Sequence, residues 1–179
     1  MSFKKDIQLK AGEDIALDFQ ARTKDLYRRC ALAGSIRRRE PVVHDVDFAV
    51  IPKGASYGAW KGRVTRRVSE IGGSIITFGD TIAGFSYRGA QVNLFLCPDA
   101  DSWGVTLMWA TGPKGHTIGM TYKAKAKGLV INSRGLWTRD DPPRRVRART
   151  EGEVGTLLGW KFKPPEARGK SEKPKQVFD

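Results

Sequence analysis

A Gly-Ser turn followed by a pair of aspartates is the feature that most constrains this chain. Gly34 and Ser35 precede a basic run, Arg37–Arg39, and Asp45 and Asp47 stand at the start of an apolar, partly β-branched segment. Residues i and i+2 of a strand point to the same face, so the two carboxylates are predicted to lie side by side. Neighbouring carboxylates repel each other unless a cation lies between them, and magnesium is usually held by one or two carboxylates plus substrate phosphates. The pattern therefore predicts a metal and phosphate site.

The Gly-Ser turn strengthens this interpretation. Such a turn offers backbone N–H groups and a hydroxyl to phosphate oxygens. The alternative is a surface turn before an edge strand that carries two solvated acids. A lone Asp-x-Asp is common, but its combination with Gly-Ser-x-Arg-Arg at this spacing favours the functional site.

The charge of the chain indicates its class of partner. The 179 residues include 32 Lys and Arg against 19 Asp and Glu, a net charge of +13. This excess implies a polyanionic partner, with nucleic acid the first candidate and an anionic membrane surface the second. No apolar run approaches a membrane span and no secretory signal is visible, so we expect an intracellular protein, cytoplasmic or nucleoid-associated, without a membrane partner.

Cysteine and histidine positions argue against a disulfide and a zinc site. Cys30 and Cys97 are isolated in apolar surroundings and are predicted to be reduced core residues. His44 and His116 have no metal-ligand spacing.

The remaining pattern alternates helical and strand periodicity. Helices are predicted over residues 15–30, 57–71, 103–108, 116–127 and 150–158. Strands are predicted over residues 47–51, 75–78, 81–87 and 90–96, with a hairpin at 128–137 and an exposed basic strand at 144–149. Asp101 or Ser102 is expected to cap the third helix. Residues 169–179 are polar and Lys-rich, which predicts disorder.

Gly34-Ser35-Ile36-Arg37-Arg38 with Asp45-Val46-Asp47 resembles the nucleotidyltransferase signature of the DNA polymerase X family, the family of DNA polymerase beta. Residues 109–113 are similar to the family's aromatic-x-Thr-Gly-Ser turn, and residues 128–137 to its Gly-x-x-Leu-Asn-Glu-x-Gly-Leu segment. Residues 159–168 resemble its C-terminal thumb signature. The resemblance implies an α+β fold with a nucleotidyltransferase palm and mixed sheet (1–108), a small α/β thumb (109–168) and a basic tail (169–179). The chain resembles the shortest form of the family, a palm plus a thumb, as in some viral members.

The resemblance also implies a function. Family members transfer a nucleotide from a triphosphate to a 3′-hydroxyl, with two Mg²⁺ or Mn²⁺ ions held by three carboxylates. The expected partners are a deoxynucleoside triphosphate and DNA, as primer-template or gapped duplex, and the protein is expected to be a monomer that fills short gaps in repair.

Three sets of residues carry the roles that the resemblance implies. The two metal-binding carboxylates are Asp45 and Asp47. The nucleotide-binding set is Gly34, Ser35, Arg38, His44, Trp109, Gly112 and Thr117. The DNA-binding set is Lys123, Lys125, Lys127, Arg144, Arg145 and Arg147.

The third catalytic carboxylate of the family falls on Asn93, in the strand predicted over residues 90–96. Asn is nearly isosteric with Asp but neutral, so the ion at the primer end is expected to bind weakly. Three explanations are open: a deliberate Asp→Asn change, a catalytically inactive DNA-binding protein, or a substitute acid such as Asp80 or Asp99. The intact remainder of the motif favours the first.

Other functions also stay open. Trp109-Ala110 departs from the Tyr-Phe pair common in relatives, so a template-independent or ribonucleotide-adding transferase is the first alternative. A non-catalytic DNA-binding protein on a polymerase scaffold is the second, indicated by Asn93. The third, a small-molecule nucleotidyltransferase, is disfavoured by the charge of +13 and the thumb signature.

Overall fold

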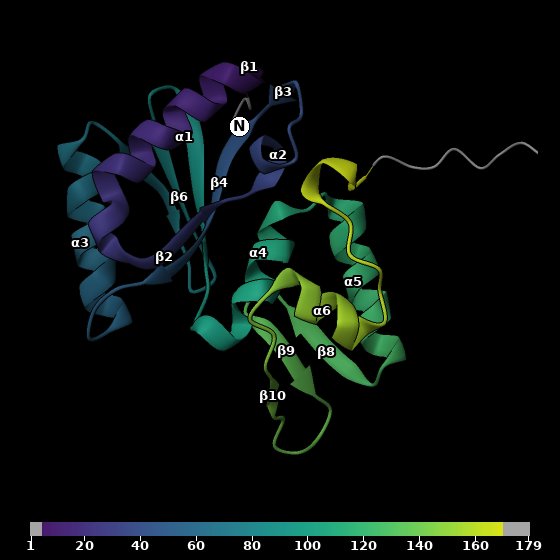
Figure 1. Ribbon diagram of the computed structural model, residues 1–179. Coiled ribbons are helices and arrows are strands. Elements are labelled where there is room, and N and C mark those ends of the chain that lie inside the picture. Colours follow the sequence, from purple (N-terminus) through teal and green to yellow (C-terminus); the bar gives the residue numbers. More distant parts are fainter. Residues whose placement is uncertain (1–4, 170–179) are drawn as a thin grey trace, which may run out of the picture.

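The computed structural model describes residues 5–169 and forms an α+β fold with two main sheets (Figure 1). The larger sheet has five strands in the order β2-β4-β7-β6-β5; β4 and β7 run parallel and the other neighbours antiparallel, so the sheet is mixed as predicted. Its strands are β2 (Tyr27–Leu32), β4 (Asp45–Pro52), β5 (Ser74–Phe78), β6 (Ile82–Tyr87) and β7 (Ala90–Leu96). Of the tail predicted to be disordered, residues 170–179 lie outside the described part of the chain.

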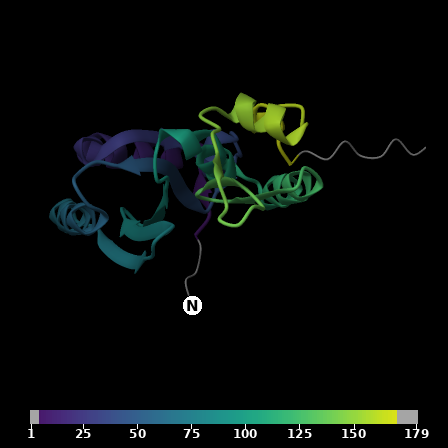
Figure 2. The same cartoon turned by 90° about the horizontal axis from the view of Figure 1, so that it is seen from below.

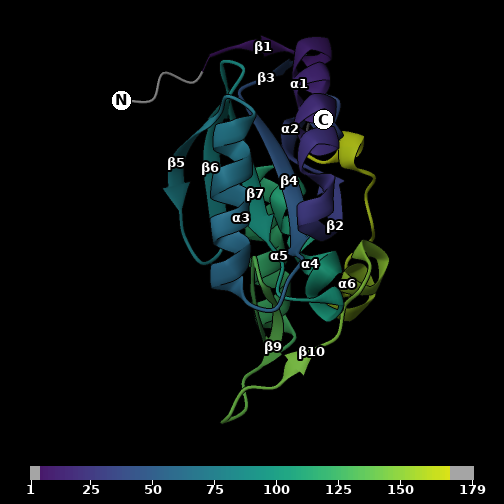
Figure 3. The same ribbon diagram turned by 90° about the vertical axis from the view of Figure 1, so that its left-hand side faces the viewer.

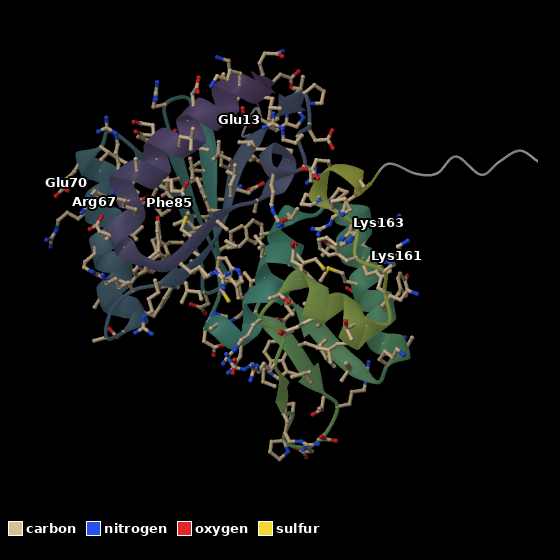
Figure 4. All side chains as sticks on the ribbon, viewed as in Figure 1. Glu13, Arg67, Glu70, Phe85, Lys161 and Lys163 are labelled. Carbon is tan, nitrogen blue, oxygen red and sulfur yellow. The ribbon has the colours of Figure 1, made fainter. Side chains whose placement is uncertain are left out.

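Two helices, α1 (Leu9–Thr23) and α3 (Tyr57–Glu70), cover one face of this sheet (Figure 3). Alternate residues of a strand point to opposite faces, so Val46 and Phe48 of β4 are buried in the core beneath these helices. Phe85 of β6 lies in the same core, in the interior of this part of the molecule (Figure 4). The aspartates of β4 therefore point to the face that these helices leave uncovered.

The segment before the Gly-Ser turn differs from its prediction. Sequence periodicity predicts one helix over residues 15–30, but α1 ends at Thr23, and a 3-10 turn, η1 (Lys24–Leu26), leads into β2. The prediction is wrong there because β2 pairs with β4 along its length. The Nε1 of Trp60 also donates a hydrogen bond of 2.8 Å to the carbonyl oxygen of Leu26. Both partners are distant in sequence, so local periodicity does not reveal them.

The C-terminal region is a second lobe beside the large sheet (Figure 2). Its helices and strands enclose a separate hydrophobic cluster that includes Met120, Leu136 and Leu158. The elements are α4 (Trp103–Thr111), α5 (Lys114–Ala126), β8 (Leu129–Asn132), β9 (Gly135–Thr138), β10 (Arg145–Val146), α6 (Glu151–Leu158) and η3 (Pro165–Ala167). The hairpin predicted over residues 128–137 is confirmed by β8 and β9.

The basic strand predicted over residues 144–149 is much shorter in the structure. Only Arg145 and Val146 pair with β9, as β10. The chain then leaves the sheet, because the Ala148 N–H donates to the carbonyl oxygen of Asp101 at 2.7 Å and the Gly104 N–H donates to the carbonyl oxygen of Ala148 at 3.0 Å. The backbone N–H and carbonyl groups of Ala148 therefore bond with Asp101 and Gly104 and not with a neighbouring strand.

Helix α4 belongs to both lobes. Trp103 and Ala110 share a hydrophobic cluster with Ala49 of β4, whereas Val105 and Met108 lie in the C-terminal cluster. The predicted boundary between residues 108 and 109 falls inside this helix.

Helix α4 begins at Trp103, as predicted. The chain enters α4 through η2 (Ala100–Ser102). Ser102 stands at the N-cap position of α4, as predicted, but its side chain makes no capping hydrogen bond. Asp99 Oδ1 instead accepts a hydrogen bond of 2.9 Å from the backbone N–H of Asp101 and caps η2.

Two further predictions concern the cysteines and the membrane. Cys30 and Cys97 are free thiols, as predicted, and burial raises the pKa of Cys30 to about 12. Within residues 5–169, every helix is too short or too polar to cross a bilayer. A small antiparallel pair, β1 (Ile7–Gln8) and β3 (Val42–Val43), completes the fold.

Candidate active site

The parallel pairing of β4 and β7 brings the candidate catalytic residues together. Asp45 pairs with Gln91 and Asp47 with Asn93 in the strand register. Since paired residues of neighbouring strands project to the same face, these side chains form one polar cluster. Asn93 Nδ2 donates a hydrogen bond of 2.9 Å to Asp47 Oδ1.

The Gly-Ser turn lies directly against this cluster. It forms a four-residue helix, α2 (Gly34–Arg37), and the Ala33 N–H before it donates to the carbonyl oxygen of Asp47 at 2.8 Å. Gly34 has a φ of +60°, and a Cβ on Gly34 would lie 2.1 Å from Asp47 Oδ2. Only glycine allows the turn to approach the carboxylate this closely.

This approach leads to a prediction for Gly34→Ala. The added methyl would force Asp47 or the turn to move. The left-handed backbone at position 34 would also destabilise the alanine variant by about 1 kcal/mol. We expect Mn²⁺ affinity, measured by titration in the presence of a triphosphate, to fall roughly tenfold or more. Gly62→Ala on α3 is the matched control, because no heavy atom lies within 4 Å of its Cβ position. Equal Mn²⁺ affinity in both variants would contradict the prediction.

Arg38 connects α2 to the end of α4. Its Nη1 donates to the carbonyl oxygen of Thr111 at 2.5 Å, and its Nε lies 3.7 Å from Glu40 Oε1. Burial lowers the pKa of Arg38, an effect opposed by the charges of Glu40 and Asp47. Guanidinium groups match phosphate oxygens in shape and keep their charge, so Arg38 is suited to an anionic ligand beside the aspartates.

A cavity of about 660 Å³ lies between β4 and the α4–α5 turn. It collects most of the residues predicted to bind nucleotide or metal. These residues are Gly34, Arg38, Asp45, Asp47, Trp109, Gly112 and Thr117. Phe95, Lys114 and Thr121 also line it. Phe95 and Lys114 were not predicted as site residues, whereas the family resemblance places Thr121, like Thr117, where relatives contact base and template. Lys114 directly follows Gly112-Pro113, which is the sequence signal that could have placed it here.

Three of the residues predicted for catalysis or nucleotide binding do not line this cavity. Ser35 is half-buried in α2, and Asn93 is only 7% exposed. The side chain of His44 is 54% exposed and its Nδ1 lies 3.1 Å from Asp6 Oδ1. His44 directly precedes Asp45, and neighbouring residues of an extended chain point to opposite sides, which explains its position.

Asp80 and Asp99, the two substitute acids considered for Asn93, lie away from the candidate site. Asp45 opens β4, whereas Asp80 and Asp99 line a different cavity together with Pro52, at the other end of that strand. Asp99 also caps η2 and pairs with Arg145.

The donor set decides which ions the site would fit. Among residues 5–169, no group of three or more His, Cys, Asp or Glu side chains is placed to hold a metal ion. Two neighbouring carboxylates together with phosphate oxygens suit one Mg²⁺ or Mn²⁺. Asn93 directs an N–H donor at Asp47, so the residues do not fit a second ion.

The basic residues predicted to bind DNA are exposed, but they are not equivalent. Lys123, Lys125 and Lys127 lie on α5 or directly after it. Arg144 forms an ion pair of 2.7 Å with Asp140, and Arg145 pairs with Asp99. Lys161 and Lys163 add positive charge on the outer side of the same lobe (Figure 4).

A buried ionic network joins α2 to α6, and the sequence analysis did not find it. The guanidinium of Arg37 donates two hydrogen bonds of 2.8 Å to the carboxylate of Glu151 and one of 2.7 Å to Thr111 Oγ1. Arg168, whose side chain is fully buried, donates to Glu151 Oε1 at 3.0 Å. Burial alone would raise the pKa of Glu151, but the hydrogen bonds and charges of the two arginines outweigh it and lower this pKa. The network fixes the C-terminal lobe against the turn that carries Gly34.

The site combines two strand-borne carboxylates, a Gly-Ser turn and a half-buried arginine. Residues 106–169 match the family model of the DNA polymerase beta thumb. The structure is similar to polymerase beta of Leishmania infantum in a ternary P/T complex, with a TM-score of 0.75, 20% identity, and coverage of 92% of this chain and 77% of that chain. For the ternary gap complex of the same protein, the TM-score is 0.76 at 19% identity, with coverage of 92% of this chain and 71% of that chain.

No curated protein matches the chain. The likeness to these polymerase beta structures confirms the predicted α+β fold class, and the match to the thumb model covers residues 106–169.

Proposed function

We propose that this protein is a DNA polymerase of the X type that adds deoxynucleotides to a 3′-hydroxyl in short gaps, impaired at Asn93. One observation carries the proposal: a single cavity collects Gly34, Arg38, Asp45 and Asp47 from the first lobe and the Trp109–Pro113 turn from the second. Two carboxylates, a phosphate-binding turn and an arginine are the groups that nucleotidyl transfer requires.

Each of these residues has a proposed role. Asp45 and Asp47 would hold a Mg²⁺ or Mn²⁺ ion together with the triphosphate. Such an ion neutralises charge on the phosphates when it is bound. Arg38 would bind phosphate oxygens, and Trp109 and Gly112 would seat the sugar of the incoming nucleotide.

DNA is the proposed second substrate. The similar polymerase beta structures are described as P/T and gap complexes. The net charge of +13 and the exposed lysines of α5 support a partner of this kind here. We also propose that the protein is intracellular and monomeric.

Salt dependence tests this DNA-binding mode. Phosphate contacts release counterions, so raising salt from about 50 to about 200 mM should weaken binding to a gapped duplex by more than roughly tenfold. Fluorescence anisotropy with a labelled duplex would measure the effect. The triple variant Lys123→Gln, Lys125→Gln, Lys127→Gln should bind less tightly and with a shallower salt slope. A flat salt response of the unchanged protein would argue against phosphate contacts as the source of affinity.

A second function, a non-catalytic DNA-binding protein, is favoured by the hydrogen bond between Asn93 and Asp47. Primer extension on a gapped duplex, with magnesium or manganese, distinguishes it from the polymerase. Extension of a single strand, or extension with ribonucleotides, would instead indicate a template-independent or ribonucleotide-adding transferase.

A further inference from the structure

Three polar side chains form a hydrogen-bonded chain across β4 and β7. Gln91 Nε2 donates to Asn93 Oδ1 at 2.9 Å, and Asn93 Nδ2 donates to Asp47 Oδ1 at 2.9 Å. An ionised carboxylate accepts hydrogen bonds and donates none. Both neighbours favour one orientation of the Asn93 amide, because Asp47 accepts from its NH₂ group and the NH₂ group of Gln91 engages its oxygen.

The neighbouring strand leaves room for this arrangement. Gly84 of β6 pairs with Asn93. A Cβ at position 84 would lie 3.3 Å from Asn93 Oδ1 and 3.0 Å from Thr77 Cγ2. Because both distances are tight, a side chain at position 84 would press on the amide oxygen and on β5. The absence of a side chain at Gly84 lets the two amides lie in line with Asp47.

This orientation decides what Asn93 can do for a cation. Mg²⁺ and Mn²⁺ take oxygen ligands, and an amide NH₂ group is not a ligand for them. The oxygen of Asn93 is engaged by Gln91, and the side chain does not line the cavity that contains Asp45 and Asp47. The N–H donor supplies Asp47 with part of the charge compensation that a second cation would give.

We infer that this site takes up one divalent cation with a nucleoside triphosphate instead of two, and that Gln91 is a positioning residue that keeps Asn93 in its donor orientation. The inference rests on the proposed function, because it concerns the same carboxylates. It predicts that the absence of a second ion depends on the orientation of the Asn93 amide, and not only on the missing negative charge at position 93.

Manganese titration followed by electron paramagnetic resonance tests the inference, with a non-hydrolysable deoxynucleoside triphosphate analogue present. The unchanged chain should bind about one Mn²⁺ and Asn93→Asp about two. Gln91→Met keeps the length of the side chain but removes its donor, so the Asn93 oxygen becomes free to turn towards the cavity. A second Mn²⁺ should then bind to this variant, roughly tenfold or more weakly than to Asn93→Asp. Gln20→Met on α1 is the matched control and should still bind about one Mn²⁺.

Each other result has a distinct meaning. Two Mn²⁺ ions on the unchanged chain would overturn the inference and leave the proposed polymerase intact. No bound Mn²⁺ in any variant would overturn both. A single Mn²⁺ on Gln91→Met would remove the positioning role of Gln91.

A measurement on the unchanged protein does not depend on how the variants fold. The side-chain amide protons of Asn93 should exchange with water at least roughly tenfold more slowly than those of the exposed Asn132, because both the amide and its acceptor are held in place. Equal exchange rates in nuclear magnetic resonance spectra would overturn the proposed orientation.

Discussion

Asn93→Asp should raise the rate of primer extension on a gapped duplex by roughly 100-fold or more in magnesium. The side chain already lies beside Asp47, 2.9 Å away from one of its carboxylate oxygens, and Asp has nearly the same shape as Asn. The change would replace an N–H donor by a third carboxylate on the same strand face. A steady-state extension assay with the unchanged protein as reference measures the effect.

Two controls make this result specific. Asn132→Asp changes the same residue type at an exposed position of β8 and should leave extension unchanged. Adding Asp45→Asn to Asn93→Asp should abolish the gain. If the unchanged chain extends as fast as Asn93→Asp, the role assigned to position 93 is wrong. If neither protein extends the primer but both bind DNA, the non-catalytic function replaces the polymerase.

Glu151→Leu should lower the free energy of unfolding by about 3–5 kcal/mol. The carboxylate is the shared acceptor of Arg37 and Arg168, so its removal leaves two guanidinium groups in low-dielectric surroundings without their counter-charge. Urea denaturation followed by tryptophan fluorescence measures the loss. Asp140→Asn is the control, since it breaks an exposed pair with Arg144 and should cost less than about 1 kcal/mol.

The triple variant Glu151→Leu, Arg37→Met, Arg168→Met should recover much of the lost stability, because it removes the unpaired charges together with the carboxylate. A triple variant no more stable than Glu151→Leu would show that packing, and not charge, dominates at this position.

The same carboxylate predicts a dependence on pH. The pKa of Glu151 is lowered in the folded protein, so the folded state binds this proton less readily than the unfolded chain. The stabilisation is complete above the unfolded pKa of about 4.5 and is lost as the pH falls through the lower folded pKa. Glu151→Leu should lack this part of the acid response.

Local pattern was sufficient for much of the fold and for half of the site. Asp45 and Asp47 were placed on one strand face by the two-residue period alone, which is a property of every strand. The amphipathic stripe of residues 57–71 predicted α3, and the pattern of residues 128–137 predicted the hairpin that β8 and β9 form. These features depend on residues close together in sequence, so the sequence by itself determined them.

Tertiary contacts decided the rest. Residues 27–32 became strand β2 because β4 offers unpaired backbone groups beside them. The network of Arg37 and Glu151 joins residues more than a hundred positions apart, and no local pattern encodes such a pair. The orientation of Asn93 was likewise decided by Gln91 and by Asp47 of a different strand, because an amide can face either way until its hydrogen-bond partners are in place.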